Sequence, residues 1–234
     1  MPARTGRRRQ SAGLLRSDQP TQPRLRAAIV ATARKMNALG INRGTAGNVS
    51  VRSKDGFLIT PSAMAYDAMK PADVVAVDAN ARARGLREPS TEWRFHHAIY
   101  VARPEVGAIV HTHSVFATAL ACLDRSIPAF HYMVAKAGGN DIRCAPYATF
   151  GTQELADEAV RALDGRQACL LSHHGMIAVG ADLDAALAMA VEVEWLAETY
   201  CRVLQIGNSS ILDADEIARN RMQFLDYGTQ RRSR

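Results

Sequence analysis

The 234-residue chain contains no apolar run that approaches the roughly 20 residues needed for a membrane-spanning helix. Its longest apolar stretch, residues 183–206, is interrupted by four acidic residues, Asp184, Glu192, Glu194 and Glu198. No membrane association is therefore expected, and the hydrophobic content of 47% is typical of a globular protein. A chain of this length can bury a large core in one domain without disulfide bonds.

Cysteine is scarce and unpaired along the sequence. The chain has no Cys-x-x-Cys pair, which argues against a zinc–thiolate site. Three of its four cysteines, Cys122, Cys169 and Cys201, lie in apolar runs and are expected to be buried thiols, whereas Cys144 does not. Arg7-Arg8-Arg9 resembles the start of a twin-arginine export signal but lacks the apolar core that such a signal needs. These features predict a protein of the reducing cytoplasm.

Signals for nucleotide triphosphates and nucleic acids are also missing. The chain has no Gly-Lys-Ser/Thr phosphate loop. Its net charge of +6 comes from the ends, because residues 1–26 carry +6 and residues 231–234 carry +3, which leaves −3 for the rest. A nucleic-acid-binding protein more often carries its basic residues on the folded surface. We therefore predict a basic, disordered tail at 1–23, a folded domain at 24–228 and a basic tail at 229–234, with no specific nucleic-acid partner.

Helical and strand patterns interleave irregularly along the folded region. Helices are expected at 24–39, from Ser90 or Thr91 to 103, at 152–163, at 182–207 and from 213 onward. Short strands are expected at 49–51, 57–60, 74–77, 108–111, 168–172 and 176–179. Tight turns such as Asp55-Gly56 join neighbouring strands. The pattern predicts a mixed or largely antiparallel sheet covered by helices.

Two histidines, His111 and His113, stand at the end of the apolar run Ala108–Val110. Side chains at i and i+2 of a strand point to the same face, so both imidazoles can meet at one point. His173 and His174 follow a second apolar strand in the same way. Strand alternation lets only one of these two join the pair, and the residues alone do not decide which. Three histidine nitrogens are the ligand set of a catalytic zinc with an open position.

Polar residues elsewhere fit such a site. Glu92, at the start of a predicted helix, becomes a candidate fourth ligand or general base beside three histidines. Small polar turns at 44–48, 60–62 and 90–91 offer N–H groups and hydroxyls to an oxyanion. The remaining histidines, His96, His97 and His131, are expected to be structural.

Several longer runs together resemble the class II aldolase/adducin family. They are Gly-Thr-Ala-Gly-Asn-Val-Ser-Val-Arg at 44–52, Glu-Trp-Arg-Phe-His at 92–96, Ile-Pro-Ala-Phe-His-Tyr-Met at 127–133, Ala-Gly-Gly-Asn at 137–140, Cys-Ala-Pro-Tyr-Ala-Thr-Phe-Gly-Thr at 144–152 and His-His-Gly at 173–175. The resemblance covers about residues 24–228. The runs at 127–133 and 144–152 make it specific, because metal binding does not require them.

The resemblance implies an α/β/α sandwich around a mostly antiparallel sheet, assembled as a homotetramer with active sites at subunit interfaces. It implies one zinc ion per subunit, bound by His111, His113 and His174, with Glu92 as the catalytic carboxylate. It further implies that Tyr132 reaches from one subunit toward the oxygen of the aldehyde bound at a neighbouring subunit. A mobile Tyr227 is implied to help in orienting that aldehyde. The residues implied in phosphate and aldehyde binding are Asn48, Ser62, Ala63, Ser90, Thr91 and Phe150.

The implied reaction is reversible cleavage of a ketose 1-phosphate, such as L-fuculose 1-phosphate, to dihydroxyacetone phosphate and an aldehyde such as L-lactaldehyde. The metal would act as a Lewis acid, and Glu92 would move the proton at C3. Two positions depart from the family pattern: Ala63 replaces a glycine and Gln230 replaces a basic residue. These departures leave other substrates open, including 5-deoxy- and 5-methylthio-pentulose 1-phosphates.

Other functions of the same family remain alternatives. An epimerase would typically carry aspartate at position 92, so Glu92 favours the aldolase, whereas a dehydratase or decarboxylase would share the metal site. An adducin-like interaction domain would be expected to lack the histidines. The arginine-rich ends are the sole support for a nucleic-acid-associated protein.

Overall fold

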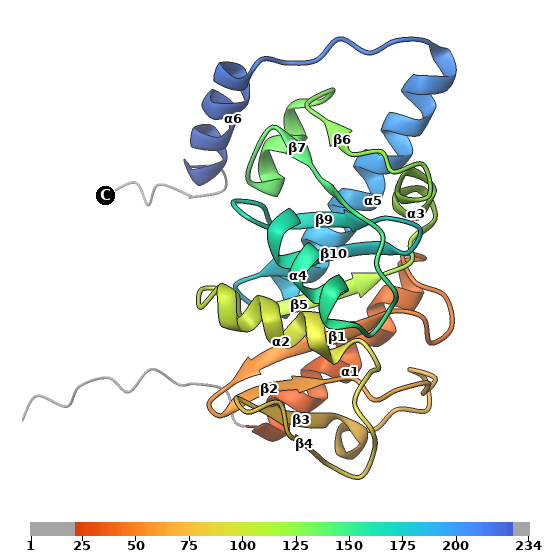
Figure 1. The fold of residues 1–234 in the computed structure, drawn as a ribbon, viewed down its shortest axis with the longest axis vertical. Coiled ribbons are helices and arrows are strands. Elements are labelled where there is room, and N and C mark those ends of the chain that lie inside the picture. The colour runs from red at the N-terminus through yellow and green to blue at the C-terminus, as the bar shows by residue number, and fades with distance from the viewer. Residues whose placement is uncertain (1–21, 227–234) are drawn as a thin grey trace, which may run out of the picture.

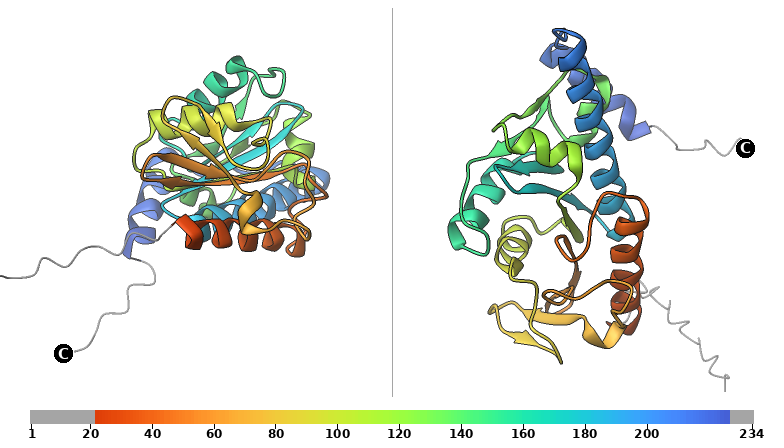
Figure 2. Two further views of the ribbon diagram at one scale, coloured as in Figure 1. Left: turned by 90° about the horizontal axis from the view of Figure 1, so that it is seen from below. Right: turned by 90° about the vertical axis from the view of Figure 1, so that its right-hand side faces the viewer.

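The computed structural model describes residues 22–226, which form three layers with a β-sheet in the centre (Figure 1). Helices α2 (Trp93–Ala102) and α4 (Gln153–Ala162) cover one face of the sheet, and the view from below shows the sheet between the two helical layers (Figure 2). Helices α1 (Gln22–Ala38), α3 (Val115–Ala121) and α5 (Leu183–Ile206) cover the other face. The predicted α/β/α sandwich is confirmed.

The sheet has eight strands in the order β4-β3-β2-β1-β5-β10-β9-β8. Their bounds are β1 (Asn48–Ser53), β2 (Gly56–Ile59), β3 (Val75–Asp78), β4 (Ala83–Arg84), β5 (Ala108–Thr112), β8 (Cys144–Ala145), β9 (Ala168–Leu171) and β10 (Gly175–Gly180). Neighbouring strands are antiparallel except β8 and β9, which are parallel. The expectation of a mostly antiparallel sheet is therefore also confirmed.

A smaller unit stands at one end of the sandwich. It contains the two-stranded sheet of β6 (Ile127–Pro128) and β7 (Asp141–Ile142), the 3₁₀ helix η2 (Tyr132–Ala137) and helix α6 (Ala214–Asp226). Ile217 of α6 packs on Ala129 and Ala135, so the last helix returns to this unit after an extended connection (Figure 1). A second 3₁₀ helix, η1 (Pro71–Asp73), precedes β3.

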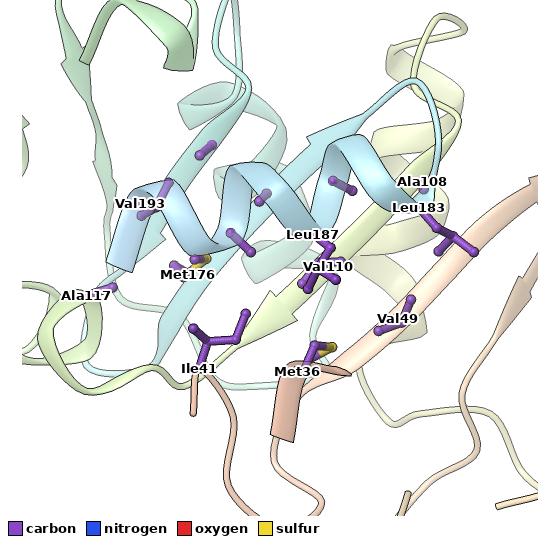
Figure 3. Packing of buried hydrophobic residues seen from close by; sticks show 14 of the residues in the cluster. Met36, Ile41, Val49, Ala108, Val110, Ala117, Met176, Leu183, Leu187 and Val193 are labelled. Carbon is purple, nitrogen blue, oxygen red and sulfur yellow. The ribbon is translucent and has the colours of Figure 1, made fainter. Parts of the chain in front are cut away.

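Two hydrophobic cores fill the spaces on either side of the sheet. Strand β5 is buried along its whole length, and its residues alternate between the cores: Ala108 and Val110 face α5, whereas Ile109 faces α2 and α4. In the first core, Leu187 and Val193 of α5 lie over the strands that carry Val110 and Met176 (Figure 3). Coverage of both faces explains why the central strands are continuous apolar runs.

Several local predictions hold in detail. Thr152 and Asp182 cap α4 and α5, because their side chains accept hydrogen bonds from the N–H groups of Leu155 and Ala185. The hairpin around Asp55-Gly56 joins β1 to β2. Helix α1 is described from Gln22, two residues before the expected start of this helix, and Pro23 is compatible with the first turn of a helix.

Two predictions are wrong. Neither Ser90 nor Thr91 caps α2. Glu92 occupies the cap position, and its side chain does not cap the helix because it points into the site described below.

Cys122 is exposed, because it follows the last turn of α3 and does not belong to the buried face of that helix. All four cysteines lie within the described residues and are free, and Cys169 is buried as expected. Among the helices of residues 22–226, none combines the length and apolar character needed to cross a membrane.

Candidate active site

Four side chains from three separate parts of the chain meet at one end of the sheet. His111 lies on β5 and shares the face of Ile109, which is the face covered by α2. His113 follows two residues later, and His174 lies in the tight turn between β9 and β10. Glu92 is the residue directly before α2. The antiparallel pairing of β5 with β10 brings the end of one strand beside the start of the other, so the three histidines become neighbours.

The ligand atoms of these four residues lie within 4.8 Å of one another. The three imidazole rings are arranged edge to face, with centroids 4.8 to 4.9 Å apart. Glu92 places Oε2 3.2 Å from His111 Nε2 and Oε1 3.0 Å from His174 Nε2. Its side chain is 7% exposed, so the carboxylate is almost completely buried against the histidines.

The hydrogen bonds around His111 indicate which atoms face the centre of the group. His111 Nδ1 lies 2.9 Å from the carbonyl oxygen of Met176, which can only accept a hydrogen bond, so Nδ1 carries the proton. Nε2 is the ring atom that faces the group, and it lies near Glu92 Oε2 and 3.0 Å from His113 Nε2. Glu92 Oε1 is buried and makes no hydrogen bond of acceptable geometry. Three imidazoles and one carboxylate that converge on one point form a group that could hold a divalent metal ion.

The charge states agree with this arrangement. Burial, together with the neighbouring charges of His111 and His174, lowers the pKa of His113 to about 4, so that ring is neutral near pH 7. Burial by itself would raise the pKa of Glu92, but His111 and His174 outweigh it and hold the pKa well below its usual range. The neutral form of His113 and the ionised form of Glu92 are the forms that bind metal ions.

The local backbone separates His174 from His173. His173 has a left-handed backbone conformation with φ of 53°, and its side chain is 53% exposed with Nε2 3.8 Å from Asp124 Oδ2. This twist leaves His174 pointing into the cluster. Gly175 follows, where a Cβ atom would lie 2.5 Å from the carbonyl oxygen of Thr112, so a side chain would not fit. The histidine before the glycine is therefore the one that joins His111 and His113.

The three predicted small-residue turns come together beside this cluster. The N–H of Ser62 donates to the carbonyl of Glu88 over 3.0 Å, and the N–H of Ser90 donates to the carbonyl of Thr60 over the same distance. Thr60 also accepts a hydrogen bond from the N–H of Val49 through Oγ1, which ties the turn at 44–48 to the other two. Hydrogen bonds thus join segments about 15 to 45 residues apart in sequence, and Ala46 and Thr91 of these segments line the cavity described below.

Buried side chains fix the turn at 44–48 through hydrogen bonds to Gly47. Gly47 donates its N–H to Asn42 Oδ1 over 3.0 Å, and its carbonyl accepts a hydrogen bond from Tyr66. A Cβ atom at Gly47 would lie 2.5 Å from both Asn42 Oδ1 and the carbonyl oxygen of His111, so glycine is required there by close approach. Asn42 and Tyr66 are supporting residues that the sequence patterns did not reveal.

Two residues predicted to bind the phosphate, Asn48 and Ala63, have additional structural features. Asn48 Nδ2 donates a hydrogen bond of 2.8 Å to Glu92 Oε2, so its side chain serves the carboxylate. Ala63 has a left-handed φ of 51°, the conformation that the glycine expected at this position would adopt without strain. Ala63 therefore occupies a backbone conformation that favours glycine.

A cavity of about 290 Å³ opens over the cluster. Its lining residues are Ala46, Thr91, Glu92, His113, Tyr147, Ala148, Phe150, His173 and His174. Phe150, which we predicted at the aldehyde end of the substrate, lines this cavity and is 65% exposed. Tyr147 and His173 are additional rim residues that we did not predict as site residues, although Tyr147 lies within the sequence run that contains Phe150.

Of the two predicted tyrosines, Tyr132 is not among the residues that line this cavity. Tyr132 is 47% exposed and lines a different cavity, where its ring stacks on Phe224 with centroids 6.0 Å apart. Tyr227 lies outside the described residues. His97 and His131 stand apart from the cluster, with His131 accepting a hydrogen bond from the N–H of Met133, whereas His96 is connected to Glu92 through Asn48.

The comparisons with known proteins agree with this geometry. The family profile of the Class II Aldolase and Adducin N-terminal domain matches residues 27–201. A 5-methylthioribulose-1-phosphate/5-deoxyribulose-1-phosphate aldolase of Rhodospirillum rubrum is 58% identical over 204 residues, covering 87% of this chain and 92% of the relative. An L-fuculose phosphate aldolase of Escherichia coli K12 is 48% identical over 206 residues, covering 88% and 96%. The solved structure of an L-fuculose 1-phosphate aldolase superposes with a TM-score of 0.84 at 37% identity, covering 86% of this chain and 96% of that one.

The chain therefore belongs to the class II aldolase/adducin family. It is a class II aldolase by its relationships, and members of this class depend on a metal ion. The acidic and histidine residues described above form a group that could bind that ion.

Proposed function

We propose that this chain cleaves a ketose 1-phosphate between C3 and C4 to give dihydroxyacetone phosphate and an aldehyde. The observation that carries the proposal is the burial of Glu92 against three histidines, beside a cavity to which two of the small-residue turns contribute Ala46 and Thr91. Three imidazoles and a carboxylate are suited to a metal ion, and the turns are suited to a phosphate.

His111, His113 and His174 would hold the metal, which we propose to be zinc. When bound, the ion would supply Lewis acidity next to the oxygens of the substrate. In cleavage the C4 hydroxyl would give its proton to Tyr132 of a neighbouring subunit as the C3–C4 bond breaks, and Glu92, having taken a proton from solvent, would deliver it to C3 of the dihydroxyacetone phosphate fragment. In condensation Glu92 removes that proton. No lysine is required, because no Schiff base is formed.

The substrate phosphate would bind the turns that contain Ser62, Ala63, Ser90 and Thr91, with Asn48 beside them. The hydroxyls of Ser62, Ser90 and Thr91 are suited to an oxyanion, because the N–H groups of Ser62 and Ser90 already donate to backbone carbonyls, and the N-terminus of α2 adds a favourable dipole. Tyr132 would act at the aldehyde bound by a neighbouring subunit of a homotetramer, and Tyr227 would help to orient that aldehyde. Tyr132 is 47% exposed and does not line the cavity at the histidines of its own chain, which supports a role at another subunit.

For the aldehyde part of the substrate we propose a small group with an apolar end. Cleavage of 5-deoxyribulose 1-phosphate releases acetaldehyde, and cleavage of the 5-methylthio analogue releases (methylthio)acetaldehyde. The 58% identical relative is named for these two substrates, and the exposed rings of Phe150 and Tyr147 line the cavity. L-fuculose 1-phosphate, which releases L-lactaldehyde, is the second candidate because the 48% identical relative is named for it.

A substrate panel tests this proposal. The purified protein, reconstituted with zinc, would be given 5-deoxyribulose, 5-methylthioribulose and L-fuculose 1-phosphates, and dihydroxyacetone phosphate would be measured by a coupled reductase. We expect kcat/KM for the preferred pentulose to exceed that for L-fuculose 1-phosphate by about 10-fold or more, as one carbon and one hydroxyl in a pocket can provide. Removal of the metal with a chelator should abolish the activity.

The panel also separates the alternatives. Formation of an epimer, loss of water or release of carbon dioxide without dihydroxyacetone phosphate would indicate an epimerase, dehydratase or decarboxylase. Full activity after metal removal would contradict the proposed role of the histidines. Elemental analysis of the purified protein identifies the metal, and light scattering measures the number of subunits.

A further inference from the structure

Five buried or nearly buried polar side chains form a continuous row that ends at Glu92. They are Tyr100, Ser50, His96, Asn48 and Glu92. We propose that this row positions Glu92, with His96 as the residue that fixes Asn48, so that Oε2 is anchored and Oε1 is the oxygen that acts. The inference rests on the proposed role of Glu92 and adds a function for His96 that the sequence did not indicate.

The row is built from two matching faces. Glu92, His96 and Tyr100 are spaced four residues apart and therefore share one face at the start and along the length of α2. Asn48 and Ser50 are spaced two residues apart on β1 and face α2, whereas Val49 between them faces the opposite core. The polar face of the strand thus packs against the polar stripe of the helix.

The distances are short throughout. Tyr100 OH lies 2.9 Å from Ser50 Oγ, which lies 2.7 Å from His96 Nδ1. His96 Nε2 lies 2.5 Å from Asn48 Oδ1, and Asn48 Nδ2 lies 2.8 Å from Glu92 Oε2. His96 is fully buried. The side chains in the middle of the row therefore have only each other as partners for their hydrogen bonds.

The chemistry allows one direction for the hydrogen bonds. The ionised carboxylate of Glu92 can only accept, so the amide nitrogen of Asn48 donates to it and the amide oxygen faces His96. That oxygen can only accept, so His96 Nε2 carries the proton and Nδ1 accepts from the hydroxyl of Ser50. Ser50 in turn accepts from Tyr100. Burial lowers the pKa of His96 to about 3, which agrees with a neutral ring that has one donor and one acceptor.

The row gives the two oxygens of Glu92 different surroundings. A free carboxylate can rotate and exchange its oxygens, but Asn48 holds Oε2 with a directed hydrogen bond. Oε1 is left buried, without a hydrogen bond, and 3.0 Å from His174 Nε2. An acceptor with no partner is the one available to a metal ion or to the proton of a substrate. A proton-transfer group is effective when it is held in one orientation, so loss of the row should slow turnover more than it weakens substrate binding.

A purely structural role for His96 makes a different prediction. If His96 only filled space between β1 and α2, an apolar residue of similar size would be tolerated and a polar one would bring no advantage. If His96 positions Asn48, a replacement must offer a donor toward Asn48 and an acceptor toward Ser50. Glutamine can offer both groups, whereas leucine offers neither.

The experiment compares His96→Leu, His96→Gln and the neighbouring control His97→Leu in the zinc-loaded protein. We expect His96→Leu to lower kcat by about 10- to 100-fold with KM within about threefold and the metal content unchanged, which is the usual effect of losing a partner behind a ligand or base. His96→Gln should recover most of this loss, and His97→Leu should resemble the parent protein, because His97 contacts the carbonyl of Ala79 at the surface. Wild-type kcat in His96→Leu, or no recovery in His96→Gln, would overturn the inference.

A second measurement is independent of catalysis and of any variant that fails to fold. The ¹⁵N spectrum of the histidine rings in metal-free parent protein, assigned by comparison with His96→Gln or selective labelling, reports which nitrogen carries the proton. We expect His96 to be protonated at Nε2 alone across neutral pH, and protonation at Nδ1 would refute the proposed direction of the row. The ¹⁵N measurement tests the direction of the hydrogen bonds even if the protein cleaves no ketose phosphate. The proposed function of Glu92 is tested separately, because an active Glu92→Gln variant would refute it.

Discussion

Substitution of Glu92 by glutamine should remove most of the turnover while it preserves the fold and the metal. The glutamine side chain has the same length, so its carbonyl oxygen can accept the 2.8 Å hydrogen bond from Asn48 that now ends at Oε2. The amide nitrogen then lies near His174 Nε2, which is 3.0 Å from Oε1 in the parent chain. The amide cannot take up a proton near neutral pH, and the loss of a general base typically costs about 10²- to 10⁴-fold in rate.

A loss of about 10³-fold corresponds to an increase of about 4 kcal/mol in the activation free energy. The assay is the kcat for cleavage of the preferred ketose 1-phosphate, with zinc content measured on the same sample. A second assay is the exchange of a C3 proton of dihydroxyacetone phosphate in D₂O, which reports the step at Glu92 without the aldehyde. Glu88→Gln is a matched control, because Glu88 is exposed and close by in sequence. A Glu92→Gln protein with a kcat or an exchange rate within about threefold of the parent would refute the assignment of Glu92 as the base.

Three further predictions follow from the same geometry. His113→Ala should purify without stoichiometric metal because a ligand atom is lost, while His97→Ala should retain it; retention by both, measured by elemental analysis, would contradict the ligand set. Metal-free parent protein should lose stability below pH 6.5, because the unfolded chain binds a proton at His96 there and the folded chain, with a His96 pKa of about 3, does not. At pH 5 the contribution of His96 amounts to a loss of about 2 kcal/mol in the free energy of unfolding, measured by urea titration. The His96→Gln protein should lack this contribution, and equal losses in both proteins would show that His96 is not buried in its neutral form. Gly47→Ala should cost about 1 to 3 kcal/mol because its Cβ would meet the carbonyl of His111 at 2.5 Å, whereas Gly207→Ala, with no atom within 4 Å, should cost much less by thermal unfolding.

Much of the fold follows from local patterns in the sequence. The caps at Thr152 and Asp182 and the hairpin at Asp55-Gly56 depend on neighbouring residues, so they could be located without knowledge of the tertiary structure. The position of Glu92 as the residue that precedes α2 could not, because its side chain is held by Asn48 instead of by its own helix. Cys122 was misassigned for a similar reason, since an apolar run does not say which side of a short helix is covered.

The sequence by itself determined the residue types of the site and the pairing of His111 with His113, because a strand repeats every two residues. It could not choose between His173 and His174 from alternation, since that choice depends on the left-handed twist at His173, where a turn breaks the strand pattern. It also described His96 as a structural histidine, because the partners of His96 are 46 and 48 residues away on another element. Only the packing of α2 on β1 decides that Glu92 has one anchored and one free oxygen, because distances between side chains of different elements are fixed by the fold and not by their spacing in the chain.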